Sequence, residues 1–261
     1  MGHLLPPAYT GSMPNLSVAT YNIHKGFSRF NRRMMVHELR DRLRALNPDI
    51  MFLQEVQGLH LGHEMKHVNW PPLPQHEFLA EAVWHETAYT GHAIYEHGHH
   101  GNAILSRYPI ISQLKEDISA HRFERRGLLH CEIQVPGQAL PVHCVCVHLA
   151  LTGRHRRMQF DRLIAALIER VPAHAPLIIS GDFNDWQNRA AKVLPQALGV
   201  HEAFECVGGA PARSFPSDWP VLRLDRIYVR GFMVTEAARH FGAPWSQISD
   251  HAALTATLHY S

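Results

Sequence analysis

The sequence is poor in cysteine and has no long apolar run. The four cysteines are Cys131, Cys144, Cys146 and Cys206, and no two of them form a Cys-x-x-Cys pair. This argues against a disulfide scaffold or a cysteine zinc site and fits a reducing cytosol. No apolar run approaches the roughly 20 residues of a membrane-spanning helix, and no basic start with an apolar core marks a secretory signal. We therefore expect a cytoplasmic protein without a transmembrane segment.

The sequence also lacks an excess of either positive or negative charge. Lys and Arg number 25 and Asp and Glu 23, which gives a formal net charge of +2, while charged residues make up 18% and hydrophobic residues 46% of the chain. This balance excludes a disordered charged chain and a coiled coil, and it gives no support for extensive binding to a nucleic-acid duplex. Histidine, in contrast, is unusually frequent, with 22 residues. They make the true charge sensitive to pH between about 5 and 7.

The chain is long enough for one large layered domain. It has 261 residues and shows no short-period repeat and no low-complexity linker. We predict a flexible N-terminal segment over residues 1–15 and a single domain over residues 16–261.

Apolar patterning predicts an α/β fold. A strand over 16–21, an amphipathic helix over 32–46 with Asn31 as its N-cap, and a strand over 50–53 form the first unit. Further strands are predicted at 102–106, 128–135, 140–149, 177–180, 224–229 and 251–259, and a second helix at 154–170. The segments 128–135 and 140–149 are expected to form an antiparallel hairpin around Pro136-Gly137.

Carboxylate and amide side chains lie at or just outside the ends of several of these strands. They are Asn22, Glu55, Asp182 with Asn184, and Asp250 with His251. Strand ends meet at a rim, so these residues can converge. Oxygen ligands of this kind suit Mg²⁺ or Mn²⁺, which completes its shell with water and substrate phosphate. The pattern predicts a site for a phosphoryl substrate.

Seven segments carry a family resemblance. In chain order they are Thr20-Tyr21-Asn22, Leu53-Gln54-Glu55, Asn102-Ala103-Ile104-Leu105-Ser106, Val147-His148-Leu149, Gly181-Asp182-Phe183-Asn184, Leu224-Asp225-Arg226-Ile227 and Ser249-Asp250-His251. With these segments in this order, the chain resembles the endonuclease/exonuclease/phosphatase superfamily. The resemblance implies a four-layer α/β sandwich, with two mixed β-sheets packed face to face and helices on the outside. It also implies metal-dependent hydrolysis of phosphate esters.

The resemblance also implies a role for each site residue. Glu55 would be the principal ligand of Mg²⁺ or Mn²⁺, supported by Asn22 and Asp250. Asp225 would orient His251, whose charge would stabilise the transition state.

Three more residues complete the expected catalytic set. Asp182 and Asn184 would position the attacking water and the phosphate, and His148 would contact the phosphate or assist the leaving oxygen. Either Asp182 or His251 could accept the proton of the water. We favour Asp182, because a histidine paired with a carboxylate is better suited to act as a cation.

Two residues are expected to bind substrate. Asn102 lies in one of the matching segments, and Arg126, in the run Glu124-Arg125-Arg126-Gly127, could reach a phosphate. The alternative for Arg126 is that it belongs to a run of charged residues that only face solvent.

The substrate is expected to be a small or lipid-linked phosphodiester. The stretch that begins at Asn102 looks more like the sphingomyelinase-like and uncharacterised bacterial members than the abasic-site enzymes. The apolar loop from Trp70 to Leu73 would suit a lipid headgroup and peripheral contact with a membrane. The alternative from the same catalytic centre is an Mg-dependent DNA endonuclease or exonuclease, which keeps nucleic acid as a partner.

Two readings from other classes compete. The segment from His63 to His67 matches His-Glu-x-x-His, with Glu64 as the base of a zinc metalloprotease. Nearby glycines and prolines disfavour the helix that this motif requires. A non-catalytic scaffold that uses the histidines is the other alternative, and the complete set of polar rim residues argues against it.

Overall fold

Two six-stranded sheets form the centre of the molecule. The computed structural model describes residues 15–29, 32–60, 69–95, 98–120 and 124–261. The first sheet has the order β11-β12-β1-β2-β4-β3 and the second the order β5-β6-β7-β8-β10-β9. The first comprises β1 (Leu16–Asn22), β2 (Ile50–His60), β3 (Glu86–Tyr95), β4 (Gly98–Ser106), β11 (Phe232–His240) and β12 (Ala253–Tyr260). The second comprises β5 (Ile110–Asp117), β6 (Gly127–Ile133), β7 (Val142–His148), β8 (Leu177–Asp182), β9 (His201–Glu202) and β10 (Asp225–Arg230).

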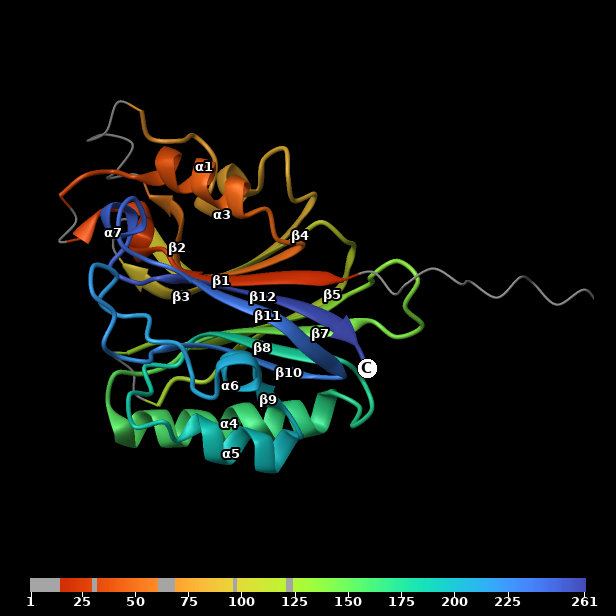
Figure 1. Ribbon diagram of the computed structural model, residues 1–261. Coiled ribbons are helices and arrows are strands. Elements are labelled where there is room, and N and C mark those ends of the chain that lie inside the picture. Colours follow the sequence, from red (N-terminus) through yellow and green to blue (C-terminus); the bar gives the residue numbers. More distant parts are fainter. Residues whose placement is uncertain (1–14, 30–31, 61–68, 96–97, 121–123) are drawn as a thin grey trace, which may run out of the picture.

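Helices cover the outer faces of both sheets. Figure 1 shows α1 (Val36–Leu46) and α3 (Gln75–Ala80) over the first sheet, and α4 (Gly153–Arg170) and α5 (Ala190–Leu198) over the second. The short elements are η1 (His24–Gly26), α6 (Ala203–Gly208) and α7 (Trp245–Ile248). The predicted fold class, a four-layer α/β sandwich with two mixed sheets face to face, is confirmed.

Three apolar clusters hold the layers together. Between the sheets, Phe52 and Ile104 pack in one cluster with Cys144 and Ile178 from the facing sheet. One outer cluster joins the first sheet to α1 and α3, and the other joins the second sheet to α4 and α5. Burial of these faces is the main force that stacks the layers.

The first helix begins later than its sequence pattern indicates. The predicted helix 32–46 starts at Val36, because Met34 forms an antiparallel bridge with Phe27 and keeps this segment out of the helix. Met35 takes the N-cap position, and the predicted cap Asn31 lies outside the described residues. The helix ends where Asn47 adopts a left-handed conformation, just before Pro48.

The second strand is longer than predicted. The apolar run predicts a strand that ends at Leu53, but β2 continues to His60, with a register shift against β4 between Leu53 and Val56. Glu55 lies inside this irregularity, so it occupies a bulge within a strand rather than a position after one. Bulges re-aim side chains and are frequent beside active sites.

The remaining predicted elements are found with small changes at their ends. β6 and β7 form the antiparallel hairpin, β1 and β2 run parallel, and α4 spans the second predicted helix. The pattern missed the strands β3, β5, β9 and β11 and the helices α3, α5, α6 and α7. In β5 and β11 most side chains are not buried, so the apolar alternation of a half-buried strand is weak.

Several sequence predictions fall on residues that the structure does not describe. Residues 1–14 of the predicted N-terminal segment and the whole His63–His67 motif lie outside the described residues. The single domain over 16–261 stays a prediction. Among the residues described, no helix combines the length and the apolar character needed to cross a membrane.

Candidate active site

Strand register brings three of the predicted residues together in the second sheet. Asp182 ends β8, and its partners on the two neighbouring strands are His148 on β7 and Asp225 on β10. Directly paired residues on neighbouring strands are close enough for their side chains to interact. The β8 carboxylate is therefore flanked by an imidazole on one side and a second carboxylate on the other.

The backbone around Asp182 is specialised. Gly181 has φ 144°, and a Cβ atom there would lie 2.0 Å from the carbonyl oxygen of Val147, so only glycine lets β8 approach β7 this closely. Asn184 has φ 49°, and its backbone N–H donates to Asp182 Oδ1 at 2.9 Å. Its side-chain amide donates to the carbonyl of Leu149 at 2.9 Å, which fixes the turn.

The first sheet supplies two more polar residues. Asn22 ends β1, and Glu55 lies in the β2 bulge with φ 56°. Left-handed backbone is unfavourable for a glutamate, and such strain is concentrated at functional sites. The amide of Asn22 donates to Asp182 Oδ2 at 3.1 Å and to Glu55 Oε1 at 3.4 Å. Asn22 thus links the two sheets and connects their carboxylates.

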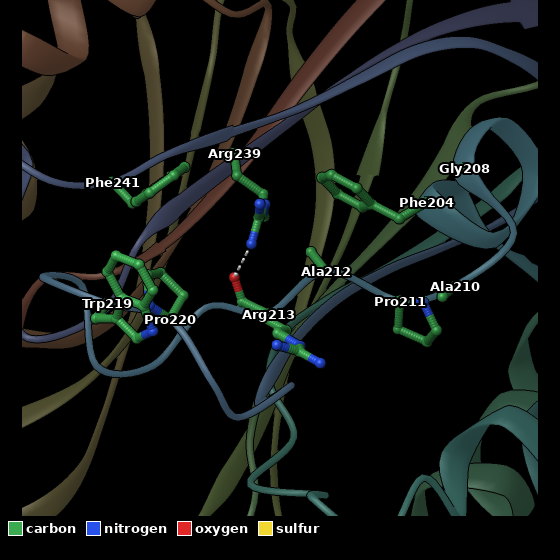
Figure 2. Close-up of a pocket in the computed structure, with 10 residues that line it drawn as sticks. All are labelled: Phe204, Gly208, Ala210, Pro211, Ala212, Arg213, Trp219, Pro220, Arg239 and Phe241. Carbon is green, nitrogen blue, oxygen red and sulfur yellow. Dashed lines mark hydrogen bonds between the residues drawn. The ribbon is translucent and has the colours of Figure 1, made fainter.

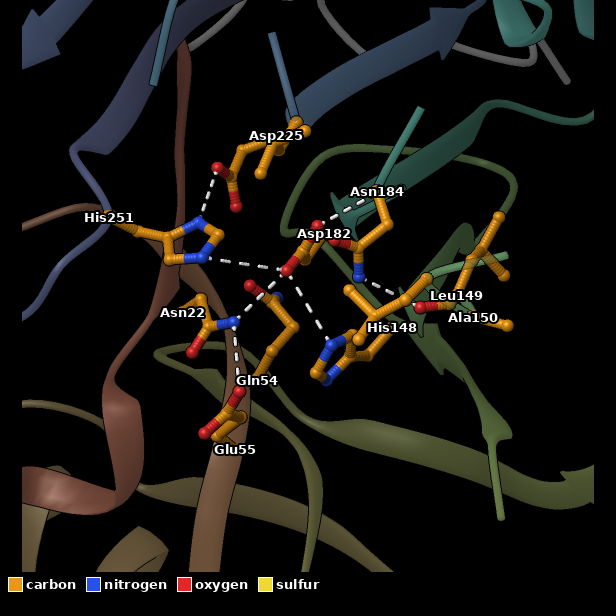
Figure 3. Close-up of polar contacts among 12 residues, drawn as sticks. Asn22, Gln54, Glu55, His148, Leu149, Ala150, Asp182, Asn184, Asp225 and His251 are labelled. Carbon is orange, nitrogen blue, oxygen red and sulfur yellow. Dashed lines mark hydrogen bonds and ion pairs between the residues drawn. The ribbon is translucent and has the colours of Figure 1, made fainter. Parts of the chain in front are cut away.

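The segment before β12 places the last two predicted residues at the same edge. His251 Nδ1 lies 2.8 Å from Asp225 Oδ2, and its Nε2 lies 3.8 Å from Asp182 Oδ2. Figure 3 shows these contacts as one polar cluster, with His148 Nε2 on the other side of Asp182 at 3.5 Å. The neighbouring Asp250 faces another partner, with its Oδ1 3.4 Å from Nδ1 of His24.

The electrostatics of the cluster favour a charged His251. Burial opposes the charge of this imidazole, but Asp225 and Asp182 outweigh burial and raise the pKa of His251 to about 10. Burial raises the pKa of Asp182 to about 6, against the opposing effect of His251. At neutral pH the pair is therefore an imidazolium beside a carboxylate.

His148 has the opposite character. Burial, together with the positive charges of Arg126 and His251, lowers its pKa well below the ordinary value. The two histidines that flank Asp182 therefore differ, since one is a cation and the other a neutral imidazole.

Glu55 is held as a carboxylate by two residues that the sequence did not single out. Burial would raise its pKa, but Lys25 and His24 outweigh burial and lower it. Lys25 Nζ lies 4.0 Å from Glu55 Oε2. Both residues come from the η1 turn, which carries no recognisable motif.

The donor set fits a hard divalent cation. Glu55 is ionised and about one-fifth exposed, and Asp250 has a buried Oδ1 that accepts no hydrogen bond. Asp182, Asp225 and His251 also lie close enough together to hold an ion. That group is less suitable, because an imidazolium has no lone pair to give to a metal. The carboxylates of Glu55 and Asp250, whose side chains are about one-fifth exposed, are better candidates.

The two predicted substrate-binding residues lie beside His148. Asn102 and Arg126 line one small cavity with it. The Asn102 amide donates to the backbone carbonyls of Gly127 at 2.9 Å and Cys146 at 3.3 Å. Arg126 Nη2 lies 3.3 Å from Glu124 Oε1. The structure thus brings both residues to the site, with these contacts directed to the protein itself.

Sequence reasoning missed the residues that brace the His251–Asp225 pair. Ser214 Oγ accepts a hydrogen bond from the backbone N–H of Asp225 at 3.1 Å, and the Phe215 ring lies 5.1 Å from the His251 ring. Ser217 Oγ donates to the carbonyl of Ser249 at 2.6 Å. These contacts join segments distant in sequence, so no local pattern could have revealed them.

Comparisons with known proteins agree with this architecture. "Uncharacterized protein YbhP" of Escherichia coli (strain K12) is 43% identical over 245 residues, which cover 94% of this chain and 96% of that protein. An endonuclease/exonuclease/phosphatase from Beutenbergia cavernae superposes with a TM-score of 0.78 at 19% identity, covering 95% of this chain and 72% of its own. A humanized D. rerio TDP2 gives a TM-score of 0.70 at 19% identity, covering 94% and 99%. These two structures show the likeness of fold alone.

A family model carries the assignment further than the individual relatives. It matches residues 19–251, which include every segment from Asn22 to His251 that forms the polar cluster. The chain belongs to the Endonuclease/Exonuclease/phosphatase family.

Proposed function

We propose that the chain is a metal-dependent phosphodiesterase that hydrolyses its substrate by in-line attack of water. The observation that carries the proposal is the continuous polar cluster from Glu55 through Asn22 and Asp182 to the His251–Asp225 pair. Members of this family act on phosphate esters, and every part of the cluster suits that chemistry.

The proposed metal site consists of Glu55 and Asp250, with Asn22 between Glu55 and Asp182. Mg²⁺ or Mn²⁺ bound there would neutralise charge on a phosphate oxygen. Asn22 already accepts a hydrogen bond from the backbone N–H of His24 through Oδ1, which fixes the orientation of its amide.

The protein groups divide the remaining work. Asp182 and Asn184 would orient the attacking water, and Asp182 would accept its proton, because His251 already carries one at neutral pH. The His251 cation would stabilise negative charge in the transition state, and Asp225 would hold the ring in place. His148 would contact the phosphate from the other side of Asp182.

The substrate class is the finer part of the proposal. A small or lipid-linked diester is one candidate, but part of the apolar loop that suggested lipid contact packs against the protein itself. The Trp70 ring stacks on Phe27 with centroids 5.8 Å apart, whereas Leu73 is 44% exposed. Nucleic acid is the other candidate, and a groove lined by Arg213, Arg239 and aromatic side chains favours it.

The test is a panel of substrates with and without metal. Bis-aryl phosphate, sphingomyelin, plasmid DNA and inositol phosphates would each be incubated with Mg²⁺, with Mn²⁺ and with EDTA. We expect hydrolysis of at least one diester that disappears in EDTA and in Glu55→Gln. The matched control is Glu38→Gln, which removes an exposed carboxylate on α1. Hydrolysis that persists in EDTA would contradict a metal-dependent centre.

A further inference from the structure

A groove formed by α6, the loop that follows it and the end of β11 shares no residue with the polar cluster. Its volume is about 660 Å³. Figure 2 shows the ten residues that line it. They are Phe204, Gly208, Ala210, Pro211, Ala212, Arg213, Trp219, Pro220, Arg239 and Phe241. This volume is in the range of pockets that bind small organic ligands, which is roughly 300 to 1,000 Å³.

The groove is positively charged. Its lining contains two arginines and no carboxylate. Arg239 donates to the backbone carbonyl of Arg213 at 3.1 Å, and its guanidinium lies 4.9 Å from the centroid of the Phe241 ring. Within the described part of the chain, neither arginine forms an ion pair. Guanidinium groups bind phosphate through several N–H donors, so the groove favours an anion.

The apolar part of the lining comprises three aromatic rings, two prolines and two alanines, and the largest of these side chains are Phe204, Trp219 and Phe241. Trp219 is 78% exposed and Phe241 is 44% exposed. Figure 2 shows them at one end of the groove and Phe204 at the other, with the arginines between. The lining includes no Val, Leu, Ile or Met. An acyl chain would pack on such aliphatic groups, whereas planar rings and guanidinium groups stack on planar bases.

We propose that this groove binds a nucleotide unit, in which an aromatic base stacks on Trp219 or Phe241 and the phosphate lies between Arg213 and Arg239. The unit can be a free nucleotide or one residue of a single strand, since both present the same chemistry. This binding site goes beyond the proposed hydrolysis and does not depend on it.

The loop that lines the groove also contacts the segments that carry Asp225 and His251. Arg213 directly precedes Ser214, which contacts the backbone of Asp225, and Ser217, which lies two residues before Trp219, holds the carbonyl of Ser249. A nucleotide in the groove would therefore lie against the loop that braces the active site. A strand bound there could continue toward the cluster.

The binding test uses the full chain in EDTA, so that no turnover is needed. Adenosine monophosphate, adenosine and inorganic phosphate would each be titrated by calorimetry, and quenching of Trp219 would be followed in parallel with Trp219→Phe as its reference. We expect the monophosphate to bind more tightly than either fragment. Arg213→Gln/Arg239→Gln should weaken it by at least about tenfold, because hydrogen bonds to charged groups are lost.

The control removes the same charge elsewhere. Arg42→Gln/Arg157→Gln changes two exposed arginines on α1 and α4 and should leave the affinity within about twofold. Tighter binding of a deoxyadenosine hexamer would identify a strand segment as the ligand, and tighter binding of the monophosphate would identify a free nucleotide. The proposal is overturned if the groove variant binds like wild type, if inorganic phosphate binds as tightly as the monophosphate, or if short-chain phosphatidic acid displaces the monophosphate with equal affinity.

Discussion

Glu55 combines a strained backbone with a stabilised charge. Its φ of 56° would suit glycine better, yet the bulge turns its carboxylate toward Asn22 and Lys25. A non-glycine residue in such a conformation costs on the order of 1 to 3 kcal/mol, which the surrounding structure must offset. The position therefore matters for orientation as well as for charge.

We expect Glu55→Gln to fold normally and to lose at least about a hundredfold in turnover, because one electrostatic contact to developing charge is worth about 10² to 10³ in rate. Affinity for Mg²⁺ should fall as well. The measurements are initial rates at limiting Mg²⁺ and a thermal unfolding curve. Wild-type turnover in Glu55→Gln together with complete loss in Glu64→Gln would favour the zinc reading instead.

His251 and Asp225 are expected to act as a unit. Their side chains lie 2.8 Å apart, and Asp225 is the first of three carboxylates, with Asp182 and Asp250, that raise the pKa of the histidine. Either alanine substitution should impair the same step, so the double variant should be little worse than the poorer single variant. The turnover of all three variants gives the coupling directly. Losses that multiply in the double variant would show that the two residues work independently.

At the scale of single elements, sequence patterning gave the strands that carry the site but not their irregularities. The order of apolar runs placed Asn22, Asp182 and His251 near strand ends, which is where they lie. The bulge at Glu55 and the late start of α1 depend on pairing with distant strands and with Phe27. The loop that braces His251 is likewise fixed only by long-range contacts.

The closeness of β7 and β8 leads to a prediction about Gly181. Gly181→Ala should destabilise the fold by about 2 kcal/mol or more, because its Cβ would lie 2.0 Å from a backbone carbonyl that cannot move without disturbing the ladder. Gly137→Ala is the matched control, since Gly137 also has a positive φ but a Cβ there would meet nothing within 4 Å. Urea unfolding of both variants compares the clash with the conformational strain alone. Equal losses would show that β8 can shift away from β7.

A histidine pair in the β6–β7 hairpin is expected to make the fold sensitive to acid. His130 Nε2 lies 3.0 Å from His143 Nδ1, and burial and the neighbouring positive charge lower the pKa of His130 to about 4. The unfolded chain takes up this proton near pH 6.5, whereas the folded chain does so only near pH 4, so stability falls as the pH is lowered between these values. At pH 5 this one group should cost about 2 kcal/mol relative to pH 7.

The measurement is urea unfolding at pH 7 and pH 5. His130→Gln should reduce the loss between the two values, while His174→Gln, at an exposed histidine, should leave it unchanged. A pH dependence that is the same in both variants would place the acid sensitivity elsewhere.

For the molecule as a whole, the small net charge limits how nucleic acid can bind. A net charge of +2 is a small excess of cations for the phosphates of a duplex, and the groove contributes two arginines, Arg213 and Arg239. Each neutralised phosphate releases nearly one counterion, so an extended basic surface would give a steep fall of affinity with salt. Salt weakens the proposed stacking contacts on Trp219 and Phe241 much less than it weakens ionic contacts to phosphates.

We therefore expect weak binding to duplex DNA with a shallow salt dependence, and faster hydrolysis of diesters than of monoesters. Plasmid binding across a salt series and turnover on matched diester and monoester substrates test both parts. A log-log salt slope steeper than about −5, which corresponds to five or six neutralised phosphates, together with efficient plasmid nicking, would instead identify a duplex nuclease. A shallower slope would mean that the protein recognises only one or a few phosphates of the substrate. The groups available for that are the arginines of the groove and the polar cluster around Asp182.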